Sequence, residues 1–251
     1  MLTTTDYFPE LENFRFKNIF DGKELFWHAL KDIETYTEKF FEGKFDNHGC
    51  INEFFQQEEK YFVCTRHFVA QKDIIIKHLK IFIGTGTVIE PTALIGPNTL
   101  LGEGVNIRHG AYIRGNILAG DHATLGHTTE VKNSIVMNHT EAGHFAYIGD
   151  SILGSYVNLG AGTKFANLPF RTLSQKKDDK PLSPIILRYD GKCIDRSMKK
   201  LGIIAGDSVE LGCNSVTCPG TFFGPESMVY PCAVVRKDFY PAKTRIDKSN
   251  L

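Results

Sequence analysis

Three histidines in the middle of the chain recur at a nearly constant spacing. His127 and His144 follow His109 in two steps whose lengths differ by a single position. A neutral imidazole accepts protons near pH 7, and it also binds metal ions. A column of histidines therefore indicates either a general base with polar neighbours or a metal site.

Two cationic residues show a related spacing. The step from Arg114 to Lys132 equals the step from His109 to His127. If this step is one full turn of the fold, the two side chains lie on adjacent strands, about 4.8 Å apart. Cations so close repel each other unless an anion lies between them, so we interpret the pair as a site for a phosphate or a nucleotide. The alternative is two surface cations without a ligand.

The element that must position these side chains is a short repeat. From Ile83 onward an aliphatic residue returns at every sixth position, and glycine directly follows several of these residues. The column is Ile83, Ile89, Ile95, Leu101, Ile107, Ile113, Ala119, Leu125 and Val131. A six-residue repeat of this kind predicts a mainly β fold, a left-handed parallel β-helix in which three units form one triangular coil. This architecture is used most often by acyltransferases.

A second column supports the repeat. Four residues after each aliphatic residue stands a small or β-branched residue, as a crowded inward position requires. These residues are Thr87, Ala93, Thr99, Val105, Ala111, Ile117, Ala123, Thr129 and Ile135. The first column continues to Phe165 with two steps of five residues, and it resumes from Ala205 to Val235. We therefore predict a β-helix domain over residues 81–251.

Residues 1–80 have a different pattern. Between Lys23 and Phe41, apolar residues follow a helical period, which predicts an amphipathic helix. The end of a solenoid must be covered, because otherwise apolar side chains and strand edges face water. We therefore interpret residues 1–80 as an N-terminal helical cap region over the open end of the β-helix. The alternative is that the segment shapes the mouth of a substrate cleft.

Residues 168–201 interrupt the repeat and are predicted to form an inserted arm. Asp190 and Gly191 lie between β-forming residues, which is typical of a two-residue hairpin turn. Long loops without structure are uncommon unless they are functional. We expect the hairpin to pack on a neighbouring subunit or over the cleft. The lysine-rich stretch at 176–180 is interpreted as a solvated loop tip.

Composition limits the partners. The chain has 251 residues, 42% of them hydrophobic, with 29 basic and 29 acidic side chains. Balanced charge gives no attraction for nucleic acid or a membrane surface. The six cysteines form no CxxC pair and are interpreted as reduced thiols. Neither a signal peptide nor a run of membrane-spanning length is apparent, so we expect a cytoplasmic protein that contacts neither nucleic acid nor membrane.

Two segments resemble a known family. The stretches Glu141–Asp150 and Val157–Thr163 are similar to the acetyltransferase domain of the bifunctional glucosamine-1-phosphate acetyltransferase and N-acetylglucosamine-1-phosphate uridylyltransferase. The resemblance covers about residues 95–167 and 199–235. The archaeal-type sugar-phosphate nucleotidylyltransferases with a C-terminal β-helix look closer still. They share the segment Ala166–Leu168 and stretches like Arg188–Lys192 and Lys199–Gly202.

The resemblance implies an acetyl-CoA-dependent N-acetyltransferase. Its acceptor would be an amino-sugar phosphate like glucosamine 1-phosphate, or a nucleotide amino sugar. His144 would be the general base, with a backbone N–H near Ala161 stabilising the oxyanion. The other implied contacts are Tyr147 and Asn158 to the sugar, Arg114 and Lys132 to its phosphate, and Ala161, Asn167 and Cys213 to acetyl-CoA. The resemblance also implies a homotrimer with His144 facing cofactor groups of the next subunit.

The chain departs from the family in four respects. Eighty residues before the repeat are too few for a nucleotidylyltransferase domain and contain no GxGTR-like phosphate loop, so we expect no uridylyl transfer. Leu168 stands where bacterial members have tyrosine, and Cys213 stands where they have serine. The arm also replaces a short lysine-containing loop that helps to hold the sugar phosphate. The placement of acetyl-CoA and the identity of the acceptor therefore stay open.

Three alternatives stand beside this interpretation. The pairs His122/His127 and His139/His144 have the spacing of two zinc ligands in the γ-class carbonic anhydrases, which share the predicted fold. The upstream ligand positions are Gly86 and Glu103, so we predict no metal. The acyl donor could instead be an acyl carrier protein, as for lipid A enzymes of this fold. The third alternative is a non-catalytic trimeric subunit that binds sugar nucleotides.

Overall fold

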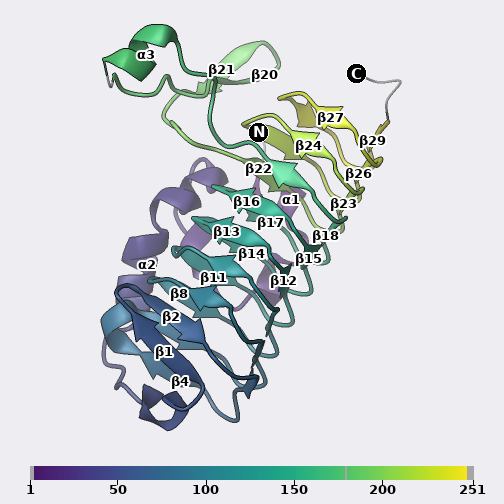
Figure 1. Cartoon of the computed structure of the whole chain (residues 1–251). Helices are drawn as coiled ribbons and strands as arrows, with labels where there is room; N and C mark the ends of the chain where they lie inside the picture. Colours follow the sequence, from purple (N-terminus) through teal and green to yellow (C-terminus); the bar gives the residue numbers. More distant parts are fainter. Residues whose placement is uncertain (1–2, 179, 248–251) are drawn as a thin grey trace.

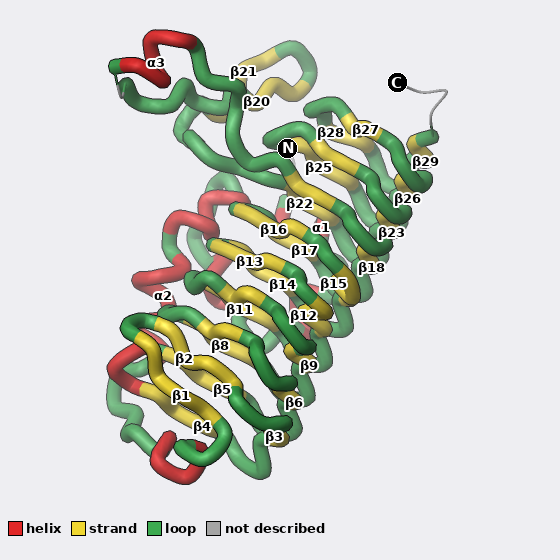
Figure 2. Tube along the Cα trace, viewed as in Figure 1, coloured by secondary structure: helices red, strands yellow, loops and turns green. Residues whose placement is uncertain are grey.

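The chain folds into a three-sided parallel β-helix. The computed structural model describes residues 3–178 and 180–247. It contains three sheets of nine strands each, which we call sheets A, B and C. Short strands alternate with loop corners along the axis (Figures 1 and 2). The predicted parallel β-helix is confirmed, and its left-handed sense stays a prediction.

The strands are short, mostly two to four residues. Sheet A contains β1 (Phe55–Glu58), β2 (Tyr61–Cys64), β7 (Leu94–Ile95), β10 (Tyr112–Ile113), β13 (Glu130–Lys132), β16 (Tyr147–Gly149), β19 (Lys164–Phe165), β24 (Val216–Thr217) and β27 (Val234–Val235). Sheet B contains β3 (Phe68–Val69), β6 (Val88–Ile89), β9 (Asn106–Ile107), β12 (Thr124–His127), β15 (Glu141–His144), β18 (Asn158–Leu159), β23 (Glu210–Leu211), β26 (Met228–Val229) and β29 (Arg245–Ile246). Sheet C contains β4 (Ile74–Ile76), β5 (Ile81–Ile83), β8 (Thr99–Leu101), β11 (Ile117–Ala119), β14 (Ser134–Val136), β17 (Ile152–Leu153), β22 (Ile203–Ala205), β25 (Thr221–Phe223) and β28 (Phe239–Tyr240).

The coils stack in the register that the repeat predicts. Ile113 of β10 pairs with Val131 of β13, which follows it by three full repeat units. Val131 pairs in turn with Ile148 of β16, one position short of three units. The shorter offset results from the five-residue steps in the repeat. Side chains at equivalent positions therefore lie above one another along the axis.

The axis of the β-helix is filled by the repeating apolar residues. Ile89, Ile107, Leu125 and Ala142 of sheet B are fully buried, and equivalent residues of the other two sheets join them in one continuous cluster. Polar residues of the second inward column satisfy their hydroxyls locally, as Thr129 does by donating to the carbonyl oxygen of Ala142 at 3.1 Å. The core therefore runs the length of the solenoid.

The first coil is closed by antiparallel strands. β1 pairs with β2, β2 with β7, β3 with β6 and β4 with β5, all antiparallel. Phe55, Phe62 and Phe68 from these strands are buried, and they join the axial cluster together with Ile51. Residues 48–76 thus cover the N-terminal end of the solenoid.

Residues 4–41 contain several short helices instead of one long helix. They are α1 (Thr4–Tyr7), η1 (Leu11–Asn13), η2 (Lys17–Phe20), η3 (Phe26–Lys31) and α2 (Ile33–Phe40), where η marks a 3₁₀ helix. Two further 3₁₀ turns, η4 (His48–Ile51) and η5 (Lys77–Leu79), lie at the N-terminal end of the solenoid. The helical period predicted between residues 23 and 41 is therefore split between η3 and α2.

The segment 4–41 lies on the outer face of sheet C, which corrects its expected position over the open end. Its aromatic residues pack against the outward-facing side chains of sheet C, including Leu118, Ile152 and Phe222. Tyr7 accepts a backbone hydrogen bond from Asp207, whereas Glu38 pairs with Lys80. We call residues 4–41 the strap, because they run from the late coils to the early ones. Among the described residues, the strap covers sheet C and leaves the faces of sheets A and B open for a site.

The arm contains the predicted hairpin. β20 (Leu187–Tyr189) pairs antiparallel with β21 (Lys192–Asp195), and the turn residues Asp190 and Gly191 both have positive φ. A short helix, α3 (Leu173–Lys177), lies farther from the solenoid (Figure 1). The hairpin packs on its own chain, where Tyr189 contacts Phe239 of β28, and its packing on a neighbouring subunit stays a prediction.

The hairpin is joined to the strap by a buried carboxylate. Asp195 Oδ2 accepts a hydrogen bond from Trp27 Nε1 at 2.8 Å and contacts His28 Nε2 at 2.9 Å. Its Oδ1 accepts from the backbone of Ser197 at 2.7 Å. Because the Ser197 hydroxyl meets the same His28 nitrogen, 3.1 Å away, the group is a structural junction and not a relay of the hydrolase type.

No helix among the described residues is long and apolar enough to cross a lipid bilayer.

Candidate functional site at the edge between sheets A and B

The three histidines lie at one edge of the prism, where each strand of sheet B turns into sheet A. We call this corner the histidine edge. It continues upward through Ala161 and Cys213, because Gly162 N donates to the carbonyl of His144 and Asn214 N donates to that of Ala161. His144, Ala161 and Cys213 therefore occupy three consecutive coils. The sequence predicted the histidine column correctly.

The rings along the edge are not equivalent. His109 and His127 stack with their ring centroids 5.4 Å apart, whereas Phe145 meets His127 in an edge contact at 5.5 Å and lies 5.8 Å from His144. His144 is exposed, and among the described residues its ring has no hydrogen-bond partner. Its nitrogens are therefore free to meet a ligand, as a general base must be.

The predicted phosphate ligands lie on sheet A, close to its corner with sheet C. Arg114 Nη1 is 2.8 Å from Glu130 Oε1, and Lys132 Nζ is 3.6 Å from Asp150 Oδ2. The hydrogen bond to Glu130 raises the pKa of Arg114. Each cation therefore has its own carboxylate, so mutual repulsion does not require an anion between them. The closeness of Arg114 and Lys132 is therefore not by itself a sign of an anion site.

Asp150 is the centre of a buried polar group. It is 4% exposed, and it accepts hydrogen bonds from Asn133 Nδ2 at 2.9 Å and from Asn167 Nδ2 at 2.5 Å. Asn167, expected to contact acetyl-CoA, is thus itself buried and held from behind. The network fixes the strand ends beneath Lys132, and a buried network of this kind is rigid when all its members are paired.

Tyr147 lies beside this group. A side chain at Gly149 would come within 2.8 Å of the Tyr147 hydroxyl and 2.7 Å of Asn167 Nδ2, so glycine leaves the room that the ring occupies. Burial raises the pKa of Tyr147, and the charge of Glu130 adds to this shift. The phenol therefore stays protonated near neutral pH and can donate a hydrogen bond.

Asn158 lies on the other side of the histidine edge. It is on the outer face of sheet B, where its Nδ2 donates to Glu210 Oε2 at 2.8 Å. Glu141 is the neighbouring residue on the preceding strand. The structure thus brings Arg114, Lys132 and Tyr147 together on one face and places Asn158 on the next. Within one chain, the residues expected to bind the sugar do not share a single face.

Sequence reasoning missed Arg108. It directly follows the inward residue Ile107, a position that Gly126 and Gly143 occupy on the next two strands of sheet B. Its Nη1 reaches 3.7 Å from where a Cβ of Gly143 would be. Arg108 is half-buried, and no hydrogen bond or ion pair of its guanidinium occurs in the described part of the chain. An unpaired cation beside His144 is suited to an anionic ligand.

The signal for Arg108 is present in the sequence. Two later units have glycine at this position, and at Gly126 the backbones of neighbouring coils approach closely. A Cβ on Gly126 would overlap the carbonyl oxygen of Gly143. Gly126 and Gly143 have no side chains to block Arg108, which lies one coil below Gly126. Its long side chain can therefore extend along these two coils to the level of His144.

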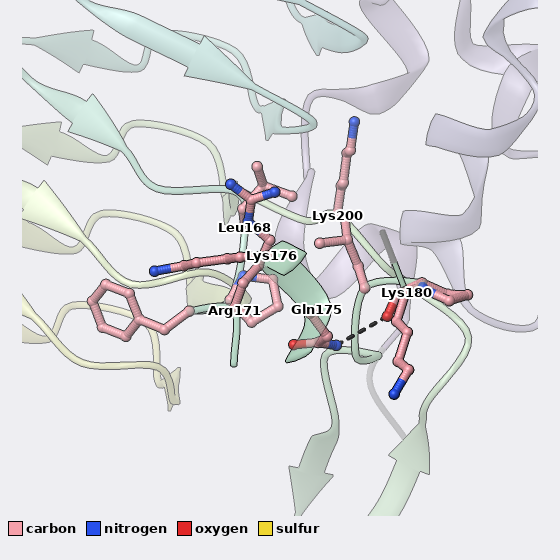
Figure 3. Close-up of a pocket in the computed structure, with 10 residues that line it drawn as sticks. Leu168, Arg171, Gln175, Lys176, Lys180 and Lys200 are labelled. Carbon is pink, nitrogen blue, oxygen red and sulfur yellow. Dashed lines mark hydrogen bonds between the residues drawn. The ribbon is translucent and has the colours of Figure 1, made fainter. Parts of the chain in front are cut away.

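A separate pocket lies at the base of the arm. It is lined by Leu168, Phe170, Gln175 and four cations, Arg171, Lys176, Lys180 and Lys200, among others. Figure 3 shows the ammonium groups of Lys180 and Lys200 pointing in opposite directions, and the dashed line marks a hydrogen bond from Gln175 to the backbone of Pro181 at 2.9 Å. The cations do not converge on one point, so the pocket lacks the form of a phosphate site.

Comparison with known proteins found relatives of the repeat region. A family model described as the GMPPB C-terminal domain matches residues 78–176. The bifunctional protein GlmU of Methanococcus maripaludis strain C5 is 35% identical over 128 residues, which are 51% of this chain and 28% of that protein. The solenoid is related to GlmU-type bifunctional proteins.

Two further similarities were found. The bifunctional sugar-1-phosphate nucleotidylyltransferase/acetyltransferase of Sulfurisphaera tokodaii is also 35% identical over 128 residues, 51% of this chain and 29% of that protein. A crystal structure of PerB from Caulobacter crescentus, in complex with CoA and GDP-perosamine, has 20% identity and a TM-score of 0.35, covering 62% of this chain and 51% of that one. The chain spans less than a third of the length of these GlmU-type relatives.

Proposed function

We propose that this protein is an acyltransferase that moves the acetyl group of acetyl-CoA to the amine of an amino-sugar phosphate or a nucleotide amino sugar. The observation that carries the proposal is the histidine edge, where an exposed His144 lies directly below Ala161 and Cys213. The similarity to GlmU-type proteins over half of the chain supports it.

The chemistry requires one proton acceptor. The amine nitrogen of the sugar attacks the thioester carbonyl, a carbon–nitrogen bond forms, and His144 accepts the proton that the nitrogen loses. The carbon–sulfur bond then breaks, and the CoA thiolate leaves with a proton returned by the imidazolium. An exposed imidazole with no partner in the described protein can perform both transfers.

The negative charge on the tetrahedral intermediate needs a hydrogen-bond donor. Gly160 N donates to Leu211 and Gly162 N donates to His144, whereas the N–H of Ala161 between them has no acceptor among the described residues. A free backbone N–H one coil above the base is suited to the oxyanion. This arrangement supports the predicted role of the segment at Ala161.

The acceptor is proposed to carry a phosphate. Arg114 and Lys132 each make one ion pair, so most of their N–H donors stay available. Tyr147 lies on the same sheet and can orient the sugar ring. Arg108 adds an unpaired cation, among the described residues, on the other side of His144, where a phosphate of the acceptor or of the donor can bind.

The site is proposed to be completed by a second copy of the chain in a homotrimer. Sheets A and B diverge from the histidine edge, so one chain supplies only one wall of a cleft. In the coil of β26 and β27, Met228, Tyr230 and Val234 are apolar residues that are 41%, 48% and 54% accessible. Such a patch is typical of a surface that another protein covers. Packing a second copy on these faces would bring its groups to Asn158.

The proposal is tested by following thiol release from acetyl-CoA with purified protein. Glucosamine 1-phosphate, other amino-sugar phosphates and nucleotide amino sugars serve as acceptors, and mass spectrometry identifies the N-acetylated product. We expect release that depends on the acceptor amine. If acetyl-CoA is inert but acetyl-acyl carrier protein is used, the donor assignment is wrong. If no donor gives product with any of these acceptors, acyl transfer is wrong, and a sugar-binding subunit takes its place.

A further inference from the structure

A second cluster of chemically active side chains lies at the N-terminal end of the solenoid, near η4 and η5. Asp46, His48 and His78 each offer one ligand atom, and these atoms all lie within 4.8 Å of one another. We propose that Asp46, His48 and His78 bind one divalent transition-metal ion. The site is independent of the proposed acyl transfer, because it uses no residue of the histidine edge.

The carboxylate is oriented toward the cluster by the backbone. Asp46 Oδ1 accepts from the backbone N–H of His48 at 3.2 Å, and Oδ2 accepts from that of Lys77 at 3.2 Å. Asp46 Oδ1 also contacts His48 Nδ1. A carboxylate that is held by two amides loses little freedom when a metal binds, which favours binding.

The two imidazoles come from separate segments. The ring centroids of His48 and His78 are 5.6 Å apart, and the edge of Phe62 supports His48 at 6.1 Å. His78 Nε2 lies 2.8 Å from Gln57 Oε1 of β1. An amide oxygen that contacts a ligating histidine fixes the orientation of its ring, and Gln57 supplies this contact here.

Two imidazole nitrogens and one carboxylate oxygen form a ligand set for zinc, cobalt or nickel. Hard ions such as magnesium and calcium prefer oxygen ligands alone. The side chains of His48 and Asp46 are 26% and 38% exposed, so an ion can enter and keep a water ligand. A bound ion would link residues 46–48 to η5. This link would lie between the strap and residues 48–76, which cover the N-terminal end of the solenoid.

A second histidine pair provides an internal comparison. His122 and His139 stack with ring centroids 5.1 Å apart at the corner between sheets C and B, and Tyr156 continues the stack. Both histidines are exposed, but no third ligand joins them in the described part of the chain, where the Asp46 cluster is the one group of three. This pair should bind metal far more weakly.

The test uses the full chain without an affinity tag, after removal of metal by a chelator. Zinc is titrated by calorimetry, cobalt by its visible absorption, and the melting temperature is measured with and without zinc. We expect one equivalent to bind and to raise the melting temperature, since the ion binds the native state. His48→Ala and His78→Gln should each weaken binding at least about tenfold, as should Asp46→Asn. His122→Ala should bind as the unmodified chain does.

Two results would overturn the proposed site. One is that the unmodified chain binds no zinc or cobalt, and the other is that His122→Ala reduces binding as much as His48→Ala does. Folding of every variant is checked by circular dichroism. If His48→Ala fails to fold, Asp46→Asn and His78→Gln still decide, because neither residue belongs to the buried core. Thiol release measured on the same samples should not depend on the ion.

Discussion

The amide of Gly162 donates to the carbonyl oxygen of His144 at 3.0 Å, so the coil that carries Ala161 rests directly on the coil that carries His144. A candidate base and a free backbone donor are therefore fixed by the same ladder that builds the fold. The distance between His144 and the Ala161 amide is therefore set by the stacking of two adjacent coils and not by a mobile loop.

Replacing the candidate base should abolish the chemical step. We expect His144→Asn to lower kcat for thiol release by about 10²- to 10⁴-fold with little change in KM, because a positioned general base contributes a factor of that order. His139→Asn is the matched control, since His139 is an exposed histidine of the same coil at the opposite edge of sheet B. Equal losses in the two variants would contradict the role of His144.

The two paired cations should act in binding. We expect Arg114→Gln and Lys132→Gln to raise KM for a phosphorylated acceptor by about tenfold or more, because a hydrogen bond to a charged group is worth about 1.5–3 kcal/mol. Turnover should change little. The control is the acceptor itself: with unphosphorylated glucosamine the variants and the unmodified protein should have the same KM. A penalty that persists without the phosphate would show that the cations only support the fold.

Arg108 should affect activity but not stability. The guanidinium has no partner in the described chain, so Arg108→Gly removes no native hydrogen bond seen there and fits a position that is glycine in later coils. We expect kcat/KM to fall by about tenfold or more, with Arg108→Lys intermediate. Separate KM values for donor and acceptor show which ligand Arg108 contacts. Unchanged kcat/KM in Arg108→Gly would assign this residue to packing alone.

Close contact between coils should make one glycine essential. Because a Cβ at Gly126 overlaps the carbonyl oxygen of Gly143, Gly126→Ala must push two coils apart. We expect a loss of about 3 kcal/mol or more in the free energy of unfolding, or insoluble protein. Gly49→Ala is the control, since nothing lies within 4 Å of its position. Urea unfolding measures both.

The junction between strap and arm should make stability depend on acid. Burial raises the pKa of Asp195, but hydrogen bonds from Trp27, Ser197 and His28 outweigh it and hold the pKa at about 2, below the ordinary value of 3.8. A lowered carboxyl pKa stabilises the native state above pH 4, and this contribution disappears as the pH falls through 2.

The matching variant is Asp195→Asn. A pKa difference of this size is worth about 2 kcal/mol, so the variant should be less stable by roughly that amount at pH 7. The difference between the two proteins, measured by urea unfolding, should shrink as the pH approaches 2. A difference that is constant from pH 7 to pH 2 would mean that the charge of Asp195 contributes nothing.

The repeat predicted the architecture because one geometric rule fixes it. A period of six places Ile113 above Ile95 and below Val131, and the structure has these pairs. The histidine edge follows from the same rule. The hairpin turn at Asp190 and Gly191 is equally local, since both residues adopt positive φ.

Contacts between remote segments could not be predicted in the same way. The ion pairs of Arg114 and Lys132 depend on side-chain rotamers and on their partners Glu130 and Asp150, which no spacing rule selects. An amphipathic helix suits either an open end or a bare face, so the sequence alone does not select the position of the strap. A signal was present, however: outward positions of sheet C are apolar, whereas most of their equivalents on sheet B are polar. Leu100, Leu118 and Ile135 are examples on sheet C, and Glu141 and Glu210 are examples on sheet B.

The strap has a consequence for how the molecule comes apart. In a solenoid each coil touches only its neighbours, so unfolding can begin at either end and spread gradually. Here the backbone of Glu10 is bonded to Asp207 and Arg15 is paired with Glu103 and Asp121, while Glu38 holds Lys80. The strap thus links early and late coils. We expect the protein to unfold in a single cooperative transition, without earlier unfolding of the terminal coils.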